Sequence, residues 1–353
     1  MSTTLTRQSG VGTRRPTLRY GDQLGPYIIT GLAGRGATSF VYRARRIDAQ
    51  EPVAIKVLHP ELVADPRRRL TFYREARIMM RMDHRNVVRF DEILEAQGYL
   101  AFVMEYIDGP TLSEWRKAQG EVCEVGLACL FMDILRGLKA AHDEGVLHRD
   151  MKPGNILITE EQGRAVAKII DFGVARLEGE PLAERERQKI IGTAAYISPE
   201  EVGAPEDVGK ASDLYSLGVM LYEVACGNRP FREEEARQLL RAHVRRRPQR
   251  PGQLNPALSQ SMEAVIMRSL AKRPDARYAT APELMAALED ALTEPVKPES
   301  AAEDKASEGA DEEQGWKQST TNNQGFVAKC ITLAGRLLGT RRVVSREAMS
   351  RSQ

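Results

Sequence analysis

The sequence lacks the long apolar run that a membrane-spanning helix needs, which is about 20 residues. The nearest candidates are 217–225, which contains Glu223, and 326–338, which is interrupted by Lys329 and Arg336. The first residues carry arginines and hydroxyl groups but no apolar stretch of the kind found in secretory signals. We therefore expect a soluble chain with neither a membrane span nor a secretory signal.

Cysteine pairs and excess charge are also absent. The four cysteines form no CxxC pair and no metal-ligand spacing, which favours reduced thiols and a cytoplasmic location. A formal net charge of +2 gives no reason to expect nucleic-acid binding. The 353 residues are sufficient for a two-lobed enzyme with terminal extensions.

The segment 148–155, HRDMKPGN, carries an acid, a cation and an amide at spacings of two and three residues. Apolar residues lie on both sides of it, so we expect a polar loop between two short buried strands. Asp150 can take a proton from a hydroxyl group, Lys152 can neutralise a phosphate, and Asn155 can ligate a hard cation. These are the groups that phosphoryl transfer requires.

HRDMKPGN resembles the catalytic loop of protein kinases, and further motifs of that family occur in the same order. VAIK at 53–56 precedes the loop, whereas DFG at 171–173 and SPE at 198–200 follow it. The resemblance runs from about Tyr27 to Leu292 and is closest to the bacterial eukaryotic-like (Hanks-type) serine/threonine protein kinases. It implies an α+β, two-lobed fold. The small lobe would hold a five-stranded antiparallel sheet with one main helix, and the larger lobe would be mostly α-helical.

The resemblance implies a catalytic role for each matching residue. Asp150 would be the catalytic base, Lys152 would lie near the transferred phosphoryl group, and Thr193 would link these two. Lys56 would contact the α- and β-phosphates of ATP, and Glu75, on a helix expected over 68–82, would orient it. Asn155 and Asp171 would hold two Mg²⁺ (or Mn²⁺) ions. In a different sequence Glu75 would be interpreted as a solvated helix charge.

The resemblance also implies an ATP-binding set. A glycine turn between two strands, 34–39, would lie over the phosphates. It departs from the GxGxxG pattern at the third glycine, which is Ser39 here. Met104 would be the gatekeeper, although a core methionine fits the same position. The expected set is Leu32, Gly34, Gly36, Ser39, Val41, Ala54, Lys56, Met104, Glu105, Ile107 and Leu157.

The KPxN form of the loop and Thr193 imply transfer of the γ-phosphoryl group of ATP to serine and threonine hydroxyls of proteins, including the chain itself. A pseudokinase that serves as a scaffold is the main alternative. The catalytic residues that would discriminate against it are all present: Lys56, Glu75, Asp150, Asn155 and Asp171. A small-molecule phosphotransferase is a third interpretation, which Lys152, Thr193 and the SPE motif at 198–200 disfavour.

Three packing roles are also implied. Asp213 would brace the catalytic loop, and Glu200 would pair with Arg277. The side chains of Met79, Phe90, His148 and Phe172 would stack as a regulatory spine.

The segment 174–192 contains no serine, threonine or tyrosine. Arg149 is typical of kinases whose activation segment is ordered by a phosphate on such a residue. We hypothesise that a glutamate of this segment (Glu178, Glu180, Glu184 or Glu186) pairs with Arg149, or that a partner orders the segment. A solvated run of charges is the alternative.

The expected organisation is a basic arm (1–26), a kinase domain (27–292), an acidic disordered linker (293–325) and a basic tail (326–353). Within the domain, 27–104 would be the small lobe, 105–109 the hinge and 110–292 the large lobe. The tail is interpreted either as an amphipathic helix that docks on the kinase, a partner or a membrane surface, or as poorly ordered. The basic runs 67–69 and 245–247 fit recruitment of an acidic partner or solvated helix faces. A dimer or a regulatory partner stays open.

Overall fold

The computed structural model describes residues 17–119, 122–173, 175–177 and 194–293. The chain divides into two compact units, which are described separately below. Unit 1 comprises Met1–Met80 with Arg89–Ile107, and unit 2 comprises Arg81–Val88 with Asp108–Gln353.

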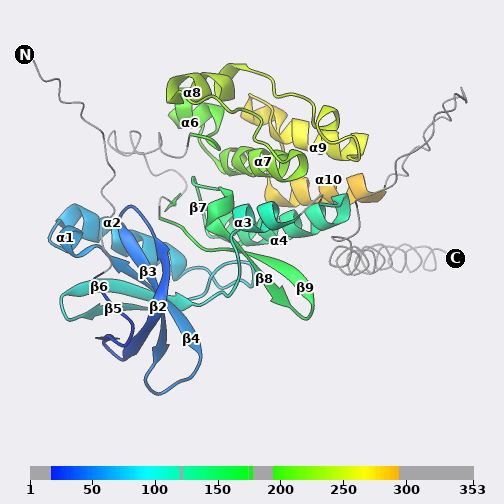
Figure 1. Cartoon of the computed structure of the whole chain (residues 1–353). Helices are drawn as coiled ribbons and strands as arrows, with labels where there is room; N and C mark the ends of the chain where they lie inside the picture. Colours follow the sequence, from blue (N-terminus) through cyan, green and yellow to red (C-terminus); the bar gives the residue numbers. More distant parts are fainter. Residues whose placement is uncertain (1–16, 120–121, 174, 178–193, 294–353) are drawn as a thin grey trace, which may run out of the picture. The chain divides into compact units, whose positions relative to one another are not determined.

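Unit 1 is built on a six-stranded antiparallel sheet (Figure 1). Its order is β1-β2-β3-β4-β6-β5. The strands are β1 (Gln23–Leu24), β2 (Tyr27–Arg35), β3 (Ser39–Arg46), β4 (Pro52–Leu58), β5 (Phe90–Ala96) and β6 (Tyr99–Glu105). The expected five strands all form, and the two-residue β1 is an addition. Gly34 lies inside β2 and Ser39 begins β3, so the glycine turn is shorter than expected.

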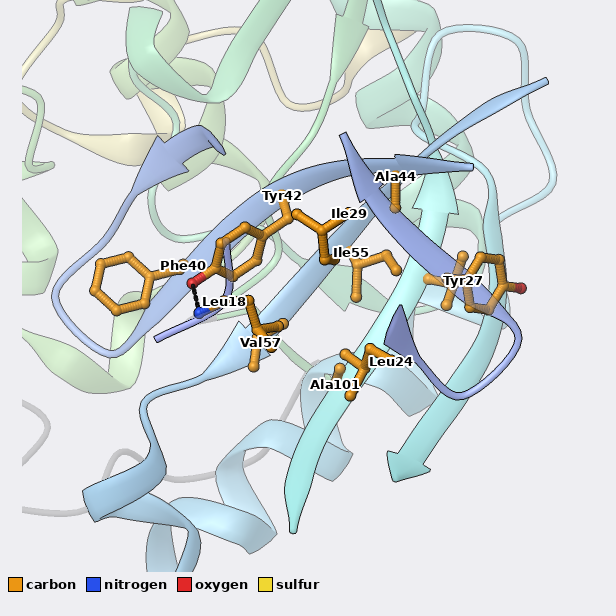
Figure 2. Packing of buried hydrophobic residues seen from close by; sticks show 11 residues of the cluster. Leu18, Leu24, Tyr27, Ile29, Phe40, Tyr42, Ala44, Ile55, Val57 and Ala101 are labelled. Atoms are coloured by element: carbon orange, nitrogen blue, oxygen red, sulfur yellow. Dashed lines mark hydrogen bonds between the residues drawn. The ribbon is translucent and has the colours of Figure 1, made fainter. Parts of the chain in front are cut away.

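The core of unit 1 lies on one face of this sheet (Figure 2). Because side chains alternate along a strand, every second residue faces it, as with Ile55 and Val57 of β4 or Ala101 and Val103 of β6. Leu18 and Leu24 complete the core, and the Leu18 N–H donates to the Tyr42 hydroxyl at 3.4 Å. Residues 17–26, assigned above to a basic arm, therefore belong to the folded sheet.

Helix α2 (Pro66–Met79) follows the short α1 (Pro60–Val63). Its start has two local causes: Pro66 occupies the first turn, and the Asp65 side chain accepts from the Arg67 N–H at 2.9 Å. Phe72 on α2 packs against Phe102 of β6, with 4.7 Å between ring centroids. Phe102 alternates with the core residues of β6, so α2 lies against the sheet face opposite the core in Figure 2.

Unit 2 is mostly helical (Figure 1). Its helices are α3 (Leu112–Ala118), α4 (Glu124–Asp143), α6 (Pro199–Gly203), α7 (Lys210–Cys226), α8 (Ala236–Arg245), α9 (Gln260–Ser269) and α10 (Ala281–Thr293). Short 3₁₀ turns are η1 (Pro153–Asn155), η3 (Pro205–Asp207), η4 (Pro251–Gln253) and η5 (Pro274–Ala276). Two small antiparallel ladders join β7 (Val146–Leu147) to β10 (Arg176–Leu177) and β8 (Ile156–Glu161) to β9 (Arg164–Ile169).

Helix α7 is the centre of unit 2, because residues on all its sides are buried from Ser212 to Tyr222. Close packing around it requires a glycine: a Cβ at Gly218 would lie 2.6 Å from the Ser269 side chain of α9. Helix α4 packs against α10 and β9 and carries the buried apolar stripe that its sequence predicts. No helix in the described part of the chain is both long and apolar enough to span a membrane.

Candidate active site

Asp213 of α7 accepts hydrogen bonds from the loop that contains Asp150 and so fixes its backbone. One Asp213 oxygen accepts from the Arg149 N–H at 2.7 Å, and the other accepts from the His148 N–H and pairs with His142 Nε2, both at 2.9 Å. Burial raises the pKa of Asp213, but the His142 hydrogen bond and the other donors outweigh it, so the net pKa is lowered. The bracing role implied for Asp213 is therefore present in the geometry.

This brace also stabilises an unusual backbone. Arg149 has a φ of 60°, in the left-handed region that residues other than glycine seldom adopt. The hydrogen bonds from two consecutive backbone amides to Asp213 hold the chain in this conformation.

The three polar side chains of the loop converge on one another. Lys152 Nζ lies 2.6 Å from Asp150 Oδ2, and the Asn155 amide donates to the same oxygen at 3.1 Å and to the Asp150 carbonyl at 2.8 Å. Both donors approach one carboxylate oxygen, which fixes the orientation of the carboxylate. The Asn155 amide is fixed too, and its carbonyl oxygen is the atom that can ligate a cation.

Asp171 is brought near Asn155 by the β8–β9 ladder. Ile156 pairs with Ile169 in this ladder, and the Ile170 N–H donates to the Asn155 carbonyl at 3.0 Å. The Asp171 side chain accepts from the Gly173 N–H at 3.0 Å, which closes the turn after the strand. One amide and one carboxylate on adjacent strand ends form a donor set suited to a hard divalent cation.

Phe172 points into unit 2, where it is 1% exposed. Its ring lies 4.9 Å from that of His148, so these two members of the expected spine are in contact. Burial lowers the pKa of His148, and the imidazole is therefore neutral in its packing role. Met79 and Phe90 belong to unit 1.

In unit 1, Lys56 of β4 and Glu75 of α2 form an ion pair. Both side chains are largely buried, with exposed fractions of 13% for Lys56 and 7% for Glu75. The ammonium also lies over the ring of Phe102, 5.4 Å from its centroid. The structure thus excludes the interpretation of Glu75 as a solvated helix charge.

Four of the expected ATP-binding residues, Val41, Ala54, Lys56 and Met104, alternate with core residues of their strands and so lie on the sheet face opposite the core. Val41 is the register partner of both Gly34 and Lys56, and Ala54 is the register partner of Met104. At the turn, the Gly36 N–H donates to the Ser39 carbonyl at 2.8 Å, and Ser39 is buried. Leu32 is exposed, whereas Glu105 and Ile107 lie at and just after the end of β6.

Leu157, the remaining member of the set, lies in β8 of unit 2. It bridges to Thr111, and the Ile158 N–H donates to the Pro110 carbonyl at 2.9 Å. The chain passes so close here that a Cβ on Gly109 would lie 2.0 Å from the Ile158 carbonyl oxygen. Only glycine fits at this position.

A second ion pair, Glu200 with Arg277, forms as the sequence implies. Both Arg277 Nη atoms donate to the Glu200 carboxylate, at 2.8 and 2.7 Å, and the Ser212 hydroxyl donates to it at 2.6 Å. Burial raises the pKa of Glu200, but Arg277 and Ser212 outweigh it, so the net pKa is lowered. Ser198 and Glu201 form a capping box at the start of α6.

Thr193 and the four glutamates of the segment 174–192 lie outside the described residues. The proposed link from Thr193 to Asp150 and the proposed pairing of a glutamate with Arg149 therefore stay predictions.

Two positioning residues were not found from the sequence. The side-chain amide of the buried Asn86 donates to the Ala167 carbonyl at 2.9 Å, and the Asn86 backbone carbonyl accepts from the Ile169 N–H at 2.9 Å, so Asn86 holds β9 next to Asp171. His142 pairs with Asp213 from within α4. Neither lies in a recognisable motif, and their partners lie far away along the chain.

A scan against family models matches residues 27–288 to the protein kinase domain. The chain therefore belongs to the protein kinase family, and its relatives place it among the bacterial Hanks-type serine/threonine kinases. It is 36% identical over 263 residues to the serine/threonine-protein kinase PkaA of Streptomyces coelicolor, covering 71% of this chain and 47% of that protein. It is likewise 36% identical over 266 residues to PknB of Mycobacterium leprae, covering 74% of this chain and 42% of PknB.

The chain thus spans less than half the length of these curated relatives. Among solved structures, the kinase domain of PknI from Mycobacterium tuberculosis is similar with a TM-score of 0.60 and 23% identity, covering 78% of this chain and 100% of that domain. This likeness supports the two-lobed kinase fold. Members of the family use ATP, a divalent metal ion and protein substrates.

Proposed function

We propose that this chain is an active serine/threonine protein kinase, which transfers the γ-phosphoryl group of ATP to hydroxyls of protein substrates. The observation that carries the proposal is the convergence of Lys152 and Asn155 on one oxygen of Asp150, on a loop braced by Asp213. A scaffold without catalysis has no need for this arrangement.

In the proposed mechanism Asp150 orients the substrate hydroxyl and accepts its proton as the phosphoryl group leaves ATP. Lys152, 2.6 Å from Asp150, stabilises negative charge on the transferred group. Lys56, oriented by Glu75, binds the α- and β-phosphates, and Thr193 links Asp150 to Lys152. The transition state is loose, so positioning and charge neutralisation supply most of the rate enhancement.

Asn155 and Asp171 are the residues that would hold Mg²⁺ or Mn²⁺. Bound there, the metal ions neutralise charge on the ATP phosphates. The adenine and the phosphates would contact Leu32, Gly34, Gly36, Ser39, Val41, Ala54, Met104, Glu105, Ile107 and Leu157. Ser39 stands in place of the third glycine, and its backbone carbonyl accepts from the Gly36 N–H in this turn.

The test is transfer of radiolabel from γ-labelled ATP, with Mg²⁺ and Mn²⁺ in parallel, to the chain itself and to a generic basic protein. Acid-stable label on serine and threonine, lost in Asp150→Asn, is the expected result. An Asp150→Asn protein that still labels its substrate would contradict the assignment of the base. No transfer by a wild-type protein that binds ATP would favour the pseudokinase instead.

We further propose that the activation segment is ordered without phosphorylation, since 174–192 offers glutamates but no acceptor hydroxyl. Phosphatase-treated protein should keep most of its transfer activity, and a loss of more than about tenfold would overturn this proposal.

The remaining assignments are the kinase domain at 27–292, to which the sheet residues within 17–26 are added, its hinge at 105–109, an acidic linker at 293–325 and a basic tail. We propose a cytoplasmic location, since the described cysteines are free thiols. Liposome flotation of the chain with and without residues 326–353 tests membrane contact by the tail. Sedimentation over a range of concentrations tests the dimer.

A further inference from the structure

One face of helix α8 is an uninterrupted row of arginines. Arg237, Arg241 and Arg245 follow one another at intervals of four residues, and all three side chains are exposed. None of the three forms an ion pair with another described residue. The stretch 236–250 continues this charge, because it contains six arginines and no acidic residue. We call Arg237, Arg241 and Arg245 the arginine face.

This row is unfavourable for the helix that carries it. Like charges four residues apart repel each other along a helix, and the row contains two such pairs. Arg237 lies in the first turn, where the helix dipole disfavours a cation, and that turn has neither an acidic residue nor a side-chain cap. A charge pattern that weakens its own helix indicates a role outside that helix.

The opposite side of α8 is firmly anchored. Leu239 and Ala242 are buried in a cluster with Phe231 and Ala194. His243 is fully buried too, and its Nδ1 lies 3.0 Å from the hydroxyl of Tyr215 on α7. Burial and the nearby Lys272 lower the pKa of His243 to about 3. The arginine face is therefore presented on a rigid support.

The same chain contains a segment of matching charge. Residues 299–313 hold seven carboxylates (Glu299, Glu303, Asp304, Glu308, Asp311, Glu312 and Glu313) and a single lysine. This segment follows α10, which ends at Thr293 in the same unit as α8. The placement of 294–353 lies outside the described residues.

The connection is long enough to reach α8. The 20 residues from Thr293 to Glu313 span up to about 70 Å when extended. A folded unit of this size has a radius of gyration of only about 16 Å. Because the segment is tethered, its effective concentration at α8 is of millimolar order, so weak ion pairs suffice for binding.

We propose that the arginine face of α8 binds the acidic segment 299–313 of the same chain. The contact is electrostatic, made by guanidinium groups and carboxylates at an exposed surface, so it weakens as salt is added. It goes beyond the proposed kinase activity and does not depend on it.

The test uses glutamyl endopeptidase, which cleaves after glutamate, on the full chain at about 20 mM salt. The rate of cleavage after Glu303 and Glu308 is measured relative to that after Glu347, which lies beyond the acidic segment. Replacing all three arginines (Arg237→Gln, Arg241→Gln and Arg245→Gln) should raise this relative rate about fivefold, given the strength of exposed ion pairs at this effective concentration. About 500 mM salt should raise it equally in the wild type.

The matched control is a triple variant of α2 in which Arg67, Arg74 and Arg77 are each replaced by glutamine. These three arginines are also exposed on one helix. Cleavage of this control should equal that of the wild type. Equal rates in all three proteins at low salt would overturn the proposal, as would equal acceleration by the two triple variants. Protection that increases with chain concentration would overturn it in favour of binding between two copies. A thermal melt confirms folding, and the α8 variant should melt no lower than the wild type because the repulsion is relieved.

Discussion

The ion pairs Lys56–Glu75 and Glu200–Arg277 join a base to an acid in each unit, but their surroundings differ. Arg277 uses all five of its N–H donors: three go to the carbonyls of Ala271, Ala211 and Lys272, and two go to the Glu200 carboxylate. Its side chain is 0% exposed. Lys56 instead retains an exposed fraction of 13%, on the sheet face that it shares with Val41, Ala54 and Met104.

The difference separates structural from functional charge. A guanidinium with every donor satisfied inside the fold has nothing left to offer a ligand, and removing it leaves a buried carboxylate uncompensated. Lys56 pairs with Glu75 but keeps 13% of its side chain exposed, so its ammonium can still meet a phosphate. We therefore expect Arg277 to contribute to stability and Lys56 to catalysis.

The largest effect on stability is expected from Arg277→Met. This change leaves Glu200 buried without its partner, which should cost about 3–5 kcal/mol of unfolding free energy. The melting temperature should fall by about 10 °C, measured by circular dichroism.

Arg273→Met is the matched control, because Arg273 forms an ion pair with Asp275 in which the side chains are 81% and 63% exposed. It should leave the melting temperature close to that of the wild type, because this pair is exposed to solvent. Equal losses of stability in Arg277→Met and Arg273→Met would contradict the claim that the buried Glu200–Arg277 pair stabilises the fold more than an exposed pair does.

Lys56→Met should lower the rate of phosphoryl transfer more than it lowers stability. Loss of the phosphate-binding cation should lower the rate of phosphoryl transfer by about 10²–10³-fold, in initial rates at saturating ATP. The melting temperature should fall as well, because Glu75 loses its partner, but less than in Arg277→Met, since the Glu75 side chain is 7% exposed and that of Glu200 only 2%. Lys139→Met removes an exposed lysine paired with Asp143 on α4 and should leave the rate unchanged. A Lys56→Met enzyme within tenfold of the wild type would remove the catalytic role.

The smallest expected effect is on the pH dependence of stability and concerns Glu201. One oxygen of its carboxylate, Oε2, accepts from both the N–H and the hydroxyl of Ser198. Burial raises its pKa to about 7, and the nearby carboxylates of Asp213 and Glu200 add to the shift. Between pH 4.5 and 7 the folded chain therefore retains a proton that the unfolded chain releases, so this group lowers stability as the pH rises.

Glu201→Gln keeps the accepting oxygen and removes the titration. Its melting temperature should gain a few degrees relative to the wild type between pH 5 and 8. The buried His148 and His243, whose pKa values are lowered mainly by burial, make stability rise with pH. They are present in both proteins, so their effect cancels when the melting temperature of Glu201→Gln is compared with that of the wild type. The exposed Glu206→Gln serves as the control. A constant difference across this range would contradict the raised pKa.

The features found from the sequence are those with local signals. The strands of the sheet appear as β-branched and aromatic runs, α4 appears as an apolar stripe, and the catalytic loop is a contiguous motif. Lys56 and Glu75 were paired only through the family pattern, since 19 residues separate them.

The features that were missed depend on contacts distant in sequence. Asn86 holds a strand 81 residues away, and no local pattern marks it. Leu18 and Leu24 enter the sheet core from a stretch whose arginines suggested an exposed arm, because a two-residue strand is too short to show alternation. The charge row on α8 was visible in the sequence, but its cost to the helix became clear only with the helix bounds and the absence of ion partners in the described structure.

The division of roles between the two ion pairs is tested most directly by phosphoryl transfer per folded molecule, measured for Lys56→Met and Arg277→Met at about 15 °C, where both are folded. The structure predicts that Arg277→Met keeps at least about a third of the wild-type rate and that Lys56→Met keeps about 1% or less. Similar losses in the two variants, or a Lys56→Met rate near that of the wild type, would contradict it.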